Sequence, residues 1–244
     1  MTRSPNRYWK GIEGGVEAAQ INLIQTLIQF FLSNEGTILD VGCGRGVSSK
    51  FLTRYFEPRN ITGIDVCRAQ LERCSTLAPE CKFELMDATQ LEFPDSSFDN
   101  MMCIEAAQHF MTRYDFLKEA YRVLKPGGKL AIHDMVFHNH ACLDTLGPDL
   151  PKENCLENLD CYRINLLEIG FKWVRIDDIT EFSMTAALRF LVSEAMRSTT
   201  RSPEVESKDG VRNHMTVNGA LDAITNHSPW KPVNCSWCLV YAVK

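Results

Sequence analysis

The residues of this chain best suited to hold a ligand form a glycine-rich segment, D-V-G-C-G-R-G, over residues 40–46. Glycine at alternate positions lets the backbone approach a ligand closely, since a side chain at any of these positions would fill that space. About nineteen residues beyond Gly46, Asp65 ends the segment I-T-G-I-D over residues 61–65. An acid after a second strand can receive the hydroxyl groups of a ribose. The spacing therefore indicates a site for a nucleoside.

The acid that precedes the glycines indicates which nucleoside would fit. A dinucleotide-binding turn reads G-x-G-x-x-G, whereas residues 42–46 read G-x-G-x-G and follow Asp40. A carboxylate at this point would repel a pyrophosphate, which prefers a helix N-terminus without a nearby anion. The same carboxylate would favour the ammonium group of a nucleoside that carries an amino acid, such as S-adenosylmethionine.

The segment 40–46 resembles the first motif of class I S-adenosylmethionine-dependent methyltransferases, and four further motifs of that family follow in order. They are F-E-L-M-D-A at 83–88, F-P-D-S-S-F-D at 93–99, M-M-C-I-E-A at 101–106 and R-V-L-K-P-G-G-K-L at 122–130. The resemblance covers roughly residues 37 to 137. It extends to the branch that includes ubiquinone, tocopherol and natural-product methyltransferases. It implies S-adenosylmethionine as cofactor and S-adenosylhomocysteine as product.

The resemblance also implies which residues hold this cofactor. Asp87 would meet the adenine amino group, and Ala88 would leave room for the adenine ring. Glu105 would face the sulfonium or the amino-acid end, although a structural hydrogen-bonding role is an equal alternative. The predicted cofactor-binding set is Asp40, Gly42, Cys43, Gly44, Gly46, Asp65, Val66, Asp87, Ala88 and Glu105.

Methyl transfer requires an aligned acceptor and, for a hydroxyl acceptor, usually a base or a metal ion. His109 lies a few residues beyond the expected strand 98–104, and a histidine suits the role of base. Asp134 is expected at the end of the strand 128–136, open to the same pocket. The pair resembles the His and Asp that line the acceptor site in small-molecule O-methyltransferases. Alternatively, His109 only shapes the pocket. The predicted acceptor-binding residues are Tyr8, Trp9, Gln108 and His109.

No metal site is predicted. His133, His138 and His140 cluster loosely, but H-x-H alone is a poor metal signature. The C-x-x-C at residues 235–238 would need a second pair at comparable spacing to bind zinc, and none is present. This motif enters an expected last strand, where its cysteines act as small apolar residues.

Composition narrows the class of protein. The chain has 244 residues, 45% of them hydrophobic, which fits one large α/β domain with an elaboration. A net charge of -5 with scattered basic residues argues against a nucleic-acid partner. Ten cysteines without a signal-peptide pattern indicate a reducing compartment, so a cytoplasmic location is expected. No apolar run is long enough for a membrane span. The expected partner is a small-molecule acceptor, and the oligomeric state stays open.

Short apolar segments that alternate with helical ones predict a Rossmann-like α/β fold with a doubly wound, mainly parallel seven-stranded sheet. The expected strands are 37–42, 60–65, 81–86, 98–104, 128–136, 171–179 and 237–243, and the expected helices are 16–32, 46–56, 67–77, 112–124 and 158–169. Residues 137–157 are expected to form a loop. One domain is expected over residues 1–244, with an N-terminal helical cover (1–35), a cofactor-binding core (36–179), a helical cap insertion (180–234, with helices at 184–197 and 211–225) and a last strand (235–244).

The leading interpretation is methyl transfer to an oxygen or nitrogen atom of a small, ring-containing metabolite. A C-methyltransferase of the quinone or tocopherol type is an alternative, as is a module that binds the cofactor without transferring a methyl group. A nicotinamide-dependent oxidoreductase is opposed by the glycine spacing and by Asp40. The N-P-P-Y signature of enzymes that methylate adenine or amide nitrogen is absent, since I-E-A-A occupies residues 104–107.

Overall fold

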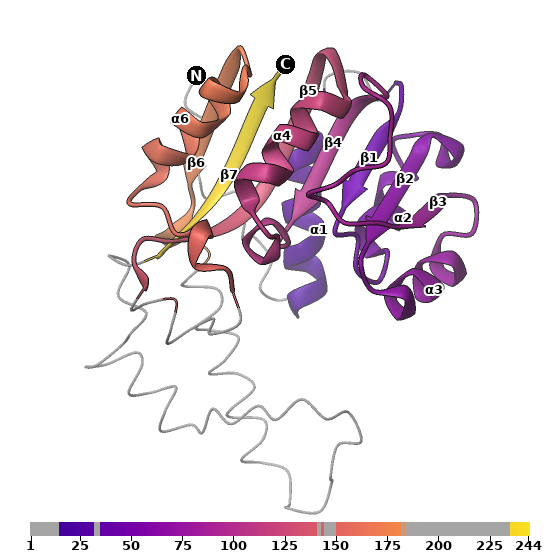
Figure 1. The fold of residues 1–244 in the computed structure, drawn as a ribbon. Helices are drawn as coiled ribbons and strands as arrows, with labels where there is room; N and C mark the ends of the chain where they lie inside the picture. Colours follow the sequence, from indigo (N-terminus) through magenta and orange to yellow (C-terminus); the bar gives the residue numbers. More distant parts are fainter. Residues whose placement is uncertain (1–14, 32–34, 141–142, 144–149, 182, 184–234) are drawn as a thin grey trace, which may run out of the picture.

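A computed structural model describes residues 15–31, 35–140, 143, 150–181, 183 and 235–244, with the side chains of helix α1 described from residue 21 onward (Figure 1). Tyr8 and Trp9 lie outside these residues, as do the expected helices at 184–197 and 211–225.

Seven strands form a single sheet in the order β3-β2-β1-β4-β5-β7-β6. Their bounds are β1 Ile38–Val41, β2 Ile61–Asp65, β3 Lys82–Leu85, β4 Phe98–Ile104, β5 Leu124–Phe137, β6 Trp173–Asp178 and β7 Cys235–Val243. The pairs from β3 across to β5 are parallel, while β7 runs antiparallel to both β5 and β6. The predicted mainly parallel, seven-stranded α/β fold is confirmed, and the C-terminal strand lies between β5 and β6 (Figure 1).

Strand β5 begins four residues earlier than the predicted start at residue 128, at Leu124. The backbone N–H of Gly127 donates to the carbonyl of Lys244 at 3.0 Å, and the N–H of Lys244 donates to the carbonyl of Gly128 at 3.0 Å. The Pro-Gly-Gly turn is therefore tied to the end of the chain and continues the sheet.

The helices lie close to their predicted positions. They are α1 Gly15–Ile28, α2 Val47–Leu52, α3 Arg68–Leu77, α4 Arg113–Val123 and α6 Leu159–Ile169. Three short 3-10 turns, η3 Pro58–Asn60, η4 Ala107–His109 and η5 Lys152–Asn154, join them to the strands. Helix α2 is shorter than the predicted 46–56 because Arg54 and Tyr55 donate to carbonyls three residues back, which tightens the chain into turns. Within the predicted loop 137–157, residues Lys152–Asn154 form the turn η5.

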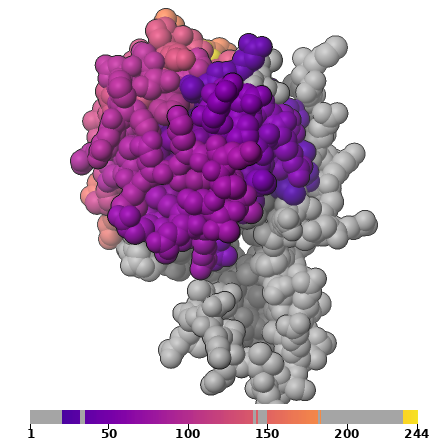
Figure 2. Space-filling view, turned by 90° about the vertical axis from the view of Figure 1, so that its right-hand side faces the viewer, coloured from indigo at the N-terminus to yellow at the C-terminus, as the bar shows by residue number. Residues whose placement is uncertain are grey.

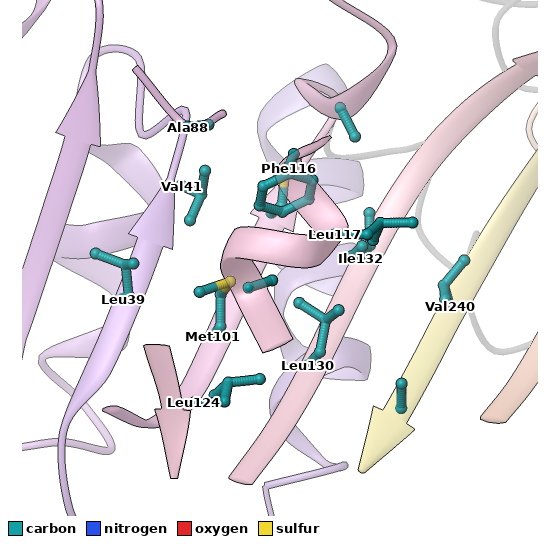
Figure 3. Close-up of a cluster of buried hydrophobic side chains, with 14 of the residues drawn as sticks. Leu39, Val41, Ala88, Met101, Phe116, Leu117, Leu124, Leu130, Ile132 and Val240 are labelled. Carbon is teal, nitrogen blue, oxygen red and sulfur yellow. The ribbon is translucent and has the colours of Figure 1, made fainter. Parts of the chain in front are cut away.

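Each face of the sheet has its own apolar core because side chains alternate along a strand. Helices α4 and α6 cover one face, where Phe116 and Leu117 of α4 pack toward Leu130 and Ile132 of β5 (Figure 3). Helices α1 and α2 cover the other face, and their buried side chains meet Ile38, Ile61, Met102 and Ala131. In Figure 2, the coloured surface of the described residues comes mostly from the first half of the chain.

The order of the strands fixes where a ligand can bind. The chain moves outward from β1 to β3 on one side, then returns to place β4 on the other side of β1. In an open α/β sheet, ligands bind beyond the carboxyl ends of the strands at such a switch point. The glycine-rich turn follows β1, and η4 follows β4, so both lie at this position.

Candidate functional site

The three glycines of the turn after β1 all have left-handed backbone conformations, with φ of 67° at Gly42, 52° at Gly44 and 80° at Gly46. Their surroundings differ. A Cβ on Gly42 would lie 2.5 Å from the Cβ of Ala106, and one on Gly46 would lie 3.1 Å from the Cα of Cys74. A Cβ on Gly44 would meet no atom of the described chain within 4 Å.

An added side chain at Gly42 or Gly46 would meet neighbouring residues rather than open space, and contact of these two glycines with the ligand stays a prediction. No larger residue fits at position 42 because the turn after β1 packs directly on the turn after β4. No larger residue fits at position 46 because helix α3 lies behind it. Gly44 alone opens onto free space, and it is the point at which a ligand can approach the backbone.

Asp40 lies inside the protein rather than at the surface of the turn. Its side chain is almost fully buried, and its Oδ2 accepts hydrogen bonds from the hydroxyls of Ser48 and Ser49, each at 2.6 Å. Burial raises the pKa of Asp40, while the two serine hydroxyls lower it. The carboxylate thus ties β1 to the first turn of α2. The side chain of Cys43 also points into the protein, with its Sγ 3.9 Å from that of Cys74.

Asp65 is attached to the glycine-rich turn from the end of β2. Its Oδ2 accepts the backbone N–H of Gly44 at 2.9 Å, and its Oδ1 accepts the N–H of Cys67 at 2.8 Å. The next residue, Val66, is a large apolar side chain with 70% of its surface exposed. An acid held at the open glycine, beside an exposed apolar side chain, fits a ligand with a sugar next to an aromatic base.

The turn after β3 carries the other predicted adenine contacts. Asp87 is exposed, and its Oδ1 accepts both the N–H and the hydroxyl of Thr89 at 2.8 Å. Ala88 is buried in the apolar core. The backbone N–H of Met86 donates to the carbonyl of Asp65 at 3.1 Å, which brings this turn beside the end of β2.

Glu105 follows β4 and has an unusual backbone conformation, a φ of 51° in a residue other than glycine. Its N–H donates to the carbonyl of His133 at 2.9 Å, and its Oε1 lies 3.6 Å from His133 Nδ1. Burial lowers the pKa of His133 to about 4. His133 is therefore neutral at neutral pH, and its contact with Glu105 is not an ion pair. Glu105 remains 61% exposed and can contact a ligand.

Gln108 and His109 belong to η4, which follows Glu105. Gln108 is buried, and its Nε2 donates to the carbonyl of Glu105 at 3.2 Å. Within the described part of the chain, Gln108 Oε1 and His133 Nδ1 are buried without a hydrogen-bond partner. His109 is exposed, and its N–H donates to the carbonyl of Ala106 at 2.9 Å.

Asp134 does not open onto a pocket, contrary to the expectation. It lies within β5 rather than at its end, and none of its surface is exposed. Its Oδ2 accepts from Arg113 Nε at 2.7 Å and from the Tyr162 hydroxyl at 3.2 Å, while its Oδ1 accepts the N–H of Met135 at 2.9 Å. A carboxylate so enclosed cannot touch an acceptor. It balances the charge of Arg113, which is also buried.

Sequence reasoning missed the partners that hold these turns: Ser48, Ser49, Arg113, Asn154 and Tyr162. Ser48 and Ser49 lie within three residues of the glycine motif and could have been suggested by their position at the start of a helix. The others are distant from one another in the sequence and carry no local pattern. In the described residues, no cluster of three His, Cys, Asp or Glu side chains could hold a metal ion. No described helix is both long enough and apolar enough to cross a membrane.

Known proteins share both the motifs and the fold. A methyltransferase domain family matches residues 39–132. Methyltransferase GfsG of Streptomyces halstedii is 31% identical over 190 residues, 71% of this chain and 67% of that protein. Erythromycin 3''-O-methyltransferase of Saccharopolyspora erythraea is 29% identical over 242 residues, 89% of this chain and 79% of that protein.

A further relative matches over a shorter region. The 2-methyl-6-phytyl-1,4-hydroquinone methyltransferase of a Synechocystis strain is 44% identical over 101 residues, which are 40% of this chain and 31% of that protein. Among solved structures, the cyclopropane synthase MmaA2 of Mycobacterium tuberculosis shares the fold, with a TM-score of 0.73 and 16% identity. That match covers 98% of this chain and 88% of that chain.

These relatives agree with the motifs of the sequence and with the fold. The cofactor of the family is S-adenosylmethionine. The chain belongs to the small-molecule branch of the class I S-adenosylmethionine-dependent methyltransferases.

Proposed function

We propose that this protein transfers a methyl group to an oxygen or nitrogen atom of a small, ring-containing metabolite, with His109 as the base. The observation that carries the proposal is the position of His109. Its side chain is exposed on η4, directly after β4, and the start of this turn packs on the glycine-rich turn through Ala106 and Gly42. A base at this point is next to the place where the cofactor would lie.

The cofactor is held by residues that the open turn presents. Gly44 gives backbone access, Asp65 accepts the ribose hydroxyls, and Val66 covers the base. Asp87 and Ala88 complete the adenine side. Asp40 acts indirectly in this scheme, because it secures α2 to the turn rather than touching the ligand. When bound, S-adenosylmethionine supplies an electrophilic methyl group on its sulfonium.

The chain's own residues then have two tasks. Gln108, next to His109 on η4, helps to shape and orient the acceptor site. As the acceptor atom attacks the methyl carbon, the imidazole of His109 takes the proton that this atom loses. Glu105 borders the same space with an exposed carboxylate and favours the positively charged end of the cofactor.

Erythromycin 3''-O-methyltransferase, which matches over 242 residues, supports oxygen as the acceptor atom. A second candidate function is C-methylation of a hydroquinone ring. It is favoured by the 44% identity over 101 residues to the hydroquinone methyltransferase. In both cases the acceptor contains a ring, and the two candidates differ in the atom that receives the methyl group.

The identity of the acceptor is tested with purified protein, methyl-labelled S-adenosylmethionine and fractionated extract of the source cells. We expect mass spectrometry to find a small molecule that gains the label, and fragmentation to locate the label on oxygen or nitrogen. Label on a ring carbon would support the second candidate instead. Tight cofactor binding without label on any molecule would favour a module that binds the cofactor only.

The base role is tested with His109→Ala and His109→Gln. Because the side chain is exposed, both variants should fold and bind S-adenosylhomocysteine as the wild type does. The turnover number should fall about 100-fold or more, within the range of general base catalysis. A wild-type rate at every pH would remove His109 from the mechanism.

A further inference from the structure

The carbonyl groups on both sides of His109 are held by one buried side chain, that of Asn154. Its Nδ2 donates to the carbonyl of Gln108 at 3.0 Å and to that of Phe110 at 2.8 Å. Its Oδ1 accepts the backbone N–H of Arg113 at 2.7 Å, at the start of α4. The side-chain amide of Asn154 therefore makes three hydrogen bonds that hold the backbone on both sides of His109, while the His109 side chain stays exposed.

Asn154 is itself held by the buried pair of Arg113 and Asp134. The guanidinium of Arg113 donates through Nη1 to the carbonyl of Asn154, through Nη2 to that of Met135 at 3.2 Å, and through Nε to Asp134 at 2.7 Å. The Tyr162 hydroxyl also donates to Asp134. Asp134 belongs to β5, so this set of contacts joins η5 to the central sheet.

Burying an ion pair is weak support for stability by itself, since removing two charges from water opposes the gain from their attraction. What this pair does provide is a fixed set of donors. Arg113 is the first residue of α4 and contacts η5 through both its backbone and its side chain. The contacts thus define one position for η5, and through Asn154 one position for η4.

From these contacts we infer that Asn154 is a positioning residue for methyl transfer, because it fixes the backbone of His109 and so aims the imidazole. The inference rests on the proposed role of His109 as base. A three-residue 3-10 turn has little stability of its own, so its orientation depends on outside contacts. A catalytic group held by such contacts spends less time in unproductive orientations.

The chemistry of Asn154 allows a selective change. Asn154→Asp keeps an oxygen that can accept from Arg113, but it removes the N–H donors to the carbonyls of Gln108 and Phe110. Asn154→Ala removes all three bonds. The matched control is Asn158→Ala, which removes an asparagine four positions away. Asn158 caps α6 by accepting the N–H of Cys161 at 3.1 Å, and among the described residues its side chain makes no hydrogen bond with η4.

The first measurement is amide hydrogen exchange of the full-length protein, read by mass spectrometry on peptides that cover residues 106–112. Asn154→Asp and Asn154→Ala should each speed exchange in these peptides at least tenfold, without a change in peptides from β1 and β4. Asn158→Ala should leave residues 106–112 as in the wild type. Unchanged exchange in both Asn154 variants would overturn the inference, whatever the protein's reaction.

The second measurement is a double-mutant cycle on turnover with the acceptor found by labelling. Asn154→Asp should lower kcat at least tenfold with the dissociation constant for S-adenosylhomocysteine within twofold of the wild type. If Asn154 acts through His109, adding Asn154→Asp to His109→Ala should slow the enzyme less than twofold further. Equal slowing in both backgrounds would overturn the inference. If His109→Ala alone leaves turnover unchanged, the proposed base has failed, and hydrogen exchange still decides whether Asn154 holds the turn.

Discussion

Replacing Gly44 by alanine tests whether the open glycine is where the backbone meets the cofactor. Gly127 provides a matched control, because it too has a left-handed conformation, with a φ of 77°, and a Cβ there would also meet no described atom within 4 Å. It lies in the Pro-Gly-Gly turn at the start of β5, away from the carboxyl ends of the parallel strands. The two substitutions therefore impose similar backbone strain at different ends of the sheet.

The expected magnitudes separate stability from binding. A left-handed conformation costs an alanine about 1–2 kcal/mol, and the reduced freedom of the unfolded chain offsets about 0.4–1 kcal/mol of that. Both variants should thus lose roughly 1 kcal/mol, or about 2–4 °C in Tm for a chain of this size. Only Gly44→Ala places a methyl group in the ligand's space. Overpacking of about 1–3 kcal/mol corresponds to an affinity loss of roughly 5- to 150-fold.

The assay is calorimetric titration with S-adenosylhomocysteine, alongside thermal unfolding of each variant without ligand. We expect similar Tm losses in the two variants, weakened binding in Gly44→Ala and unchanged binding in Gly127→Ala. Equal affinities in the two variants would refute the reasoning, because the added methyl group would then not meet the ligand. Weakened binding in Gly127→Ala would show that the loss reflects destabilisation rather than contact.

Three further outcomes can be measured. Asp65→Asn should weaken S-adenosylhomocysteine binding by roughly 1–3 kcal/mol. An amide has one acceptor oxygen, so it cannot accept the N–H groups of Gly44 and Cys67 and also a hydrogen bond from the ribose. An unchanged dissociation constant would exclude the ribose role. Burial lowers the pKa of His133 to about 4, so between pH 6.5 and pH 4 the unfolded chain binds a proton that the folded protein does not. The free energy of unfolding should then fall with decreasing pH by up to about 3 kcal/mol from this residue, and His133→Leu should lack that part in urea titrations; parallel pH curves would contradict the assignment. Tyr162→Phe removes one hydrogen bond to Asp134 while Arg113 remains, so it should lower the free energy of unfolding by about 1–3 kcal/mol, and no change in urea titration would contradict the role of this hydroxyl.

The fold was predictable because its signals are local. Strand β4 occupies the predicted residues 98–104, and α3 begins one residue from its predicted start. Apolar alternation, glycines and helix caps act over a few neighbouring residues, and they determine these elements directly. The start of β5 was missed because it depends on distant partners: Leu124 pairs with Phe98 of β4, and Gly127 and Gly128 bond to Lys244.

Within the site, too, the sequence predicted the features that depend on neighbouring residues and missed those that depend on distant ones. The glycine-rich turn and Asp65 could be linked from the sequence, since both belong to one βαβ unit. The spacing did not reveal which glycine faces open space, because that depends on Ala106 and Cys74, which come from other elements. Asp134 was misplaced for a related reason. A strand pattern shows the face to which a residue points, but not that a distant arginine will occupy that face.

The acceptor side of the site depends most on distant contacts, and the length of η4 explains why. The turn has three residues, too few to stabilise its own conformation. The glycine-rich turn, in contrast, continues into α2 and is secured by Asp40 and the two serines. A short turn that must aim a base needs partners from outside, and Asn154 provides them from 45 residues further along the chain. The buried charge of Asp134 then has a physical reason: Arg113 can hold η5 only if its own charge is balanced within the core.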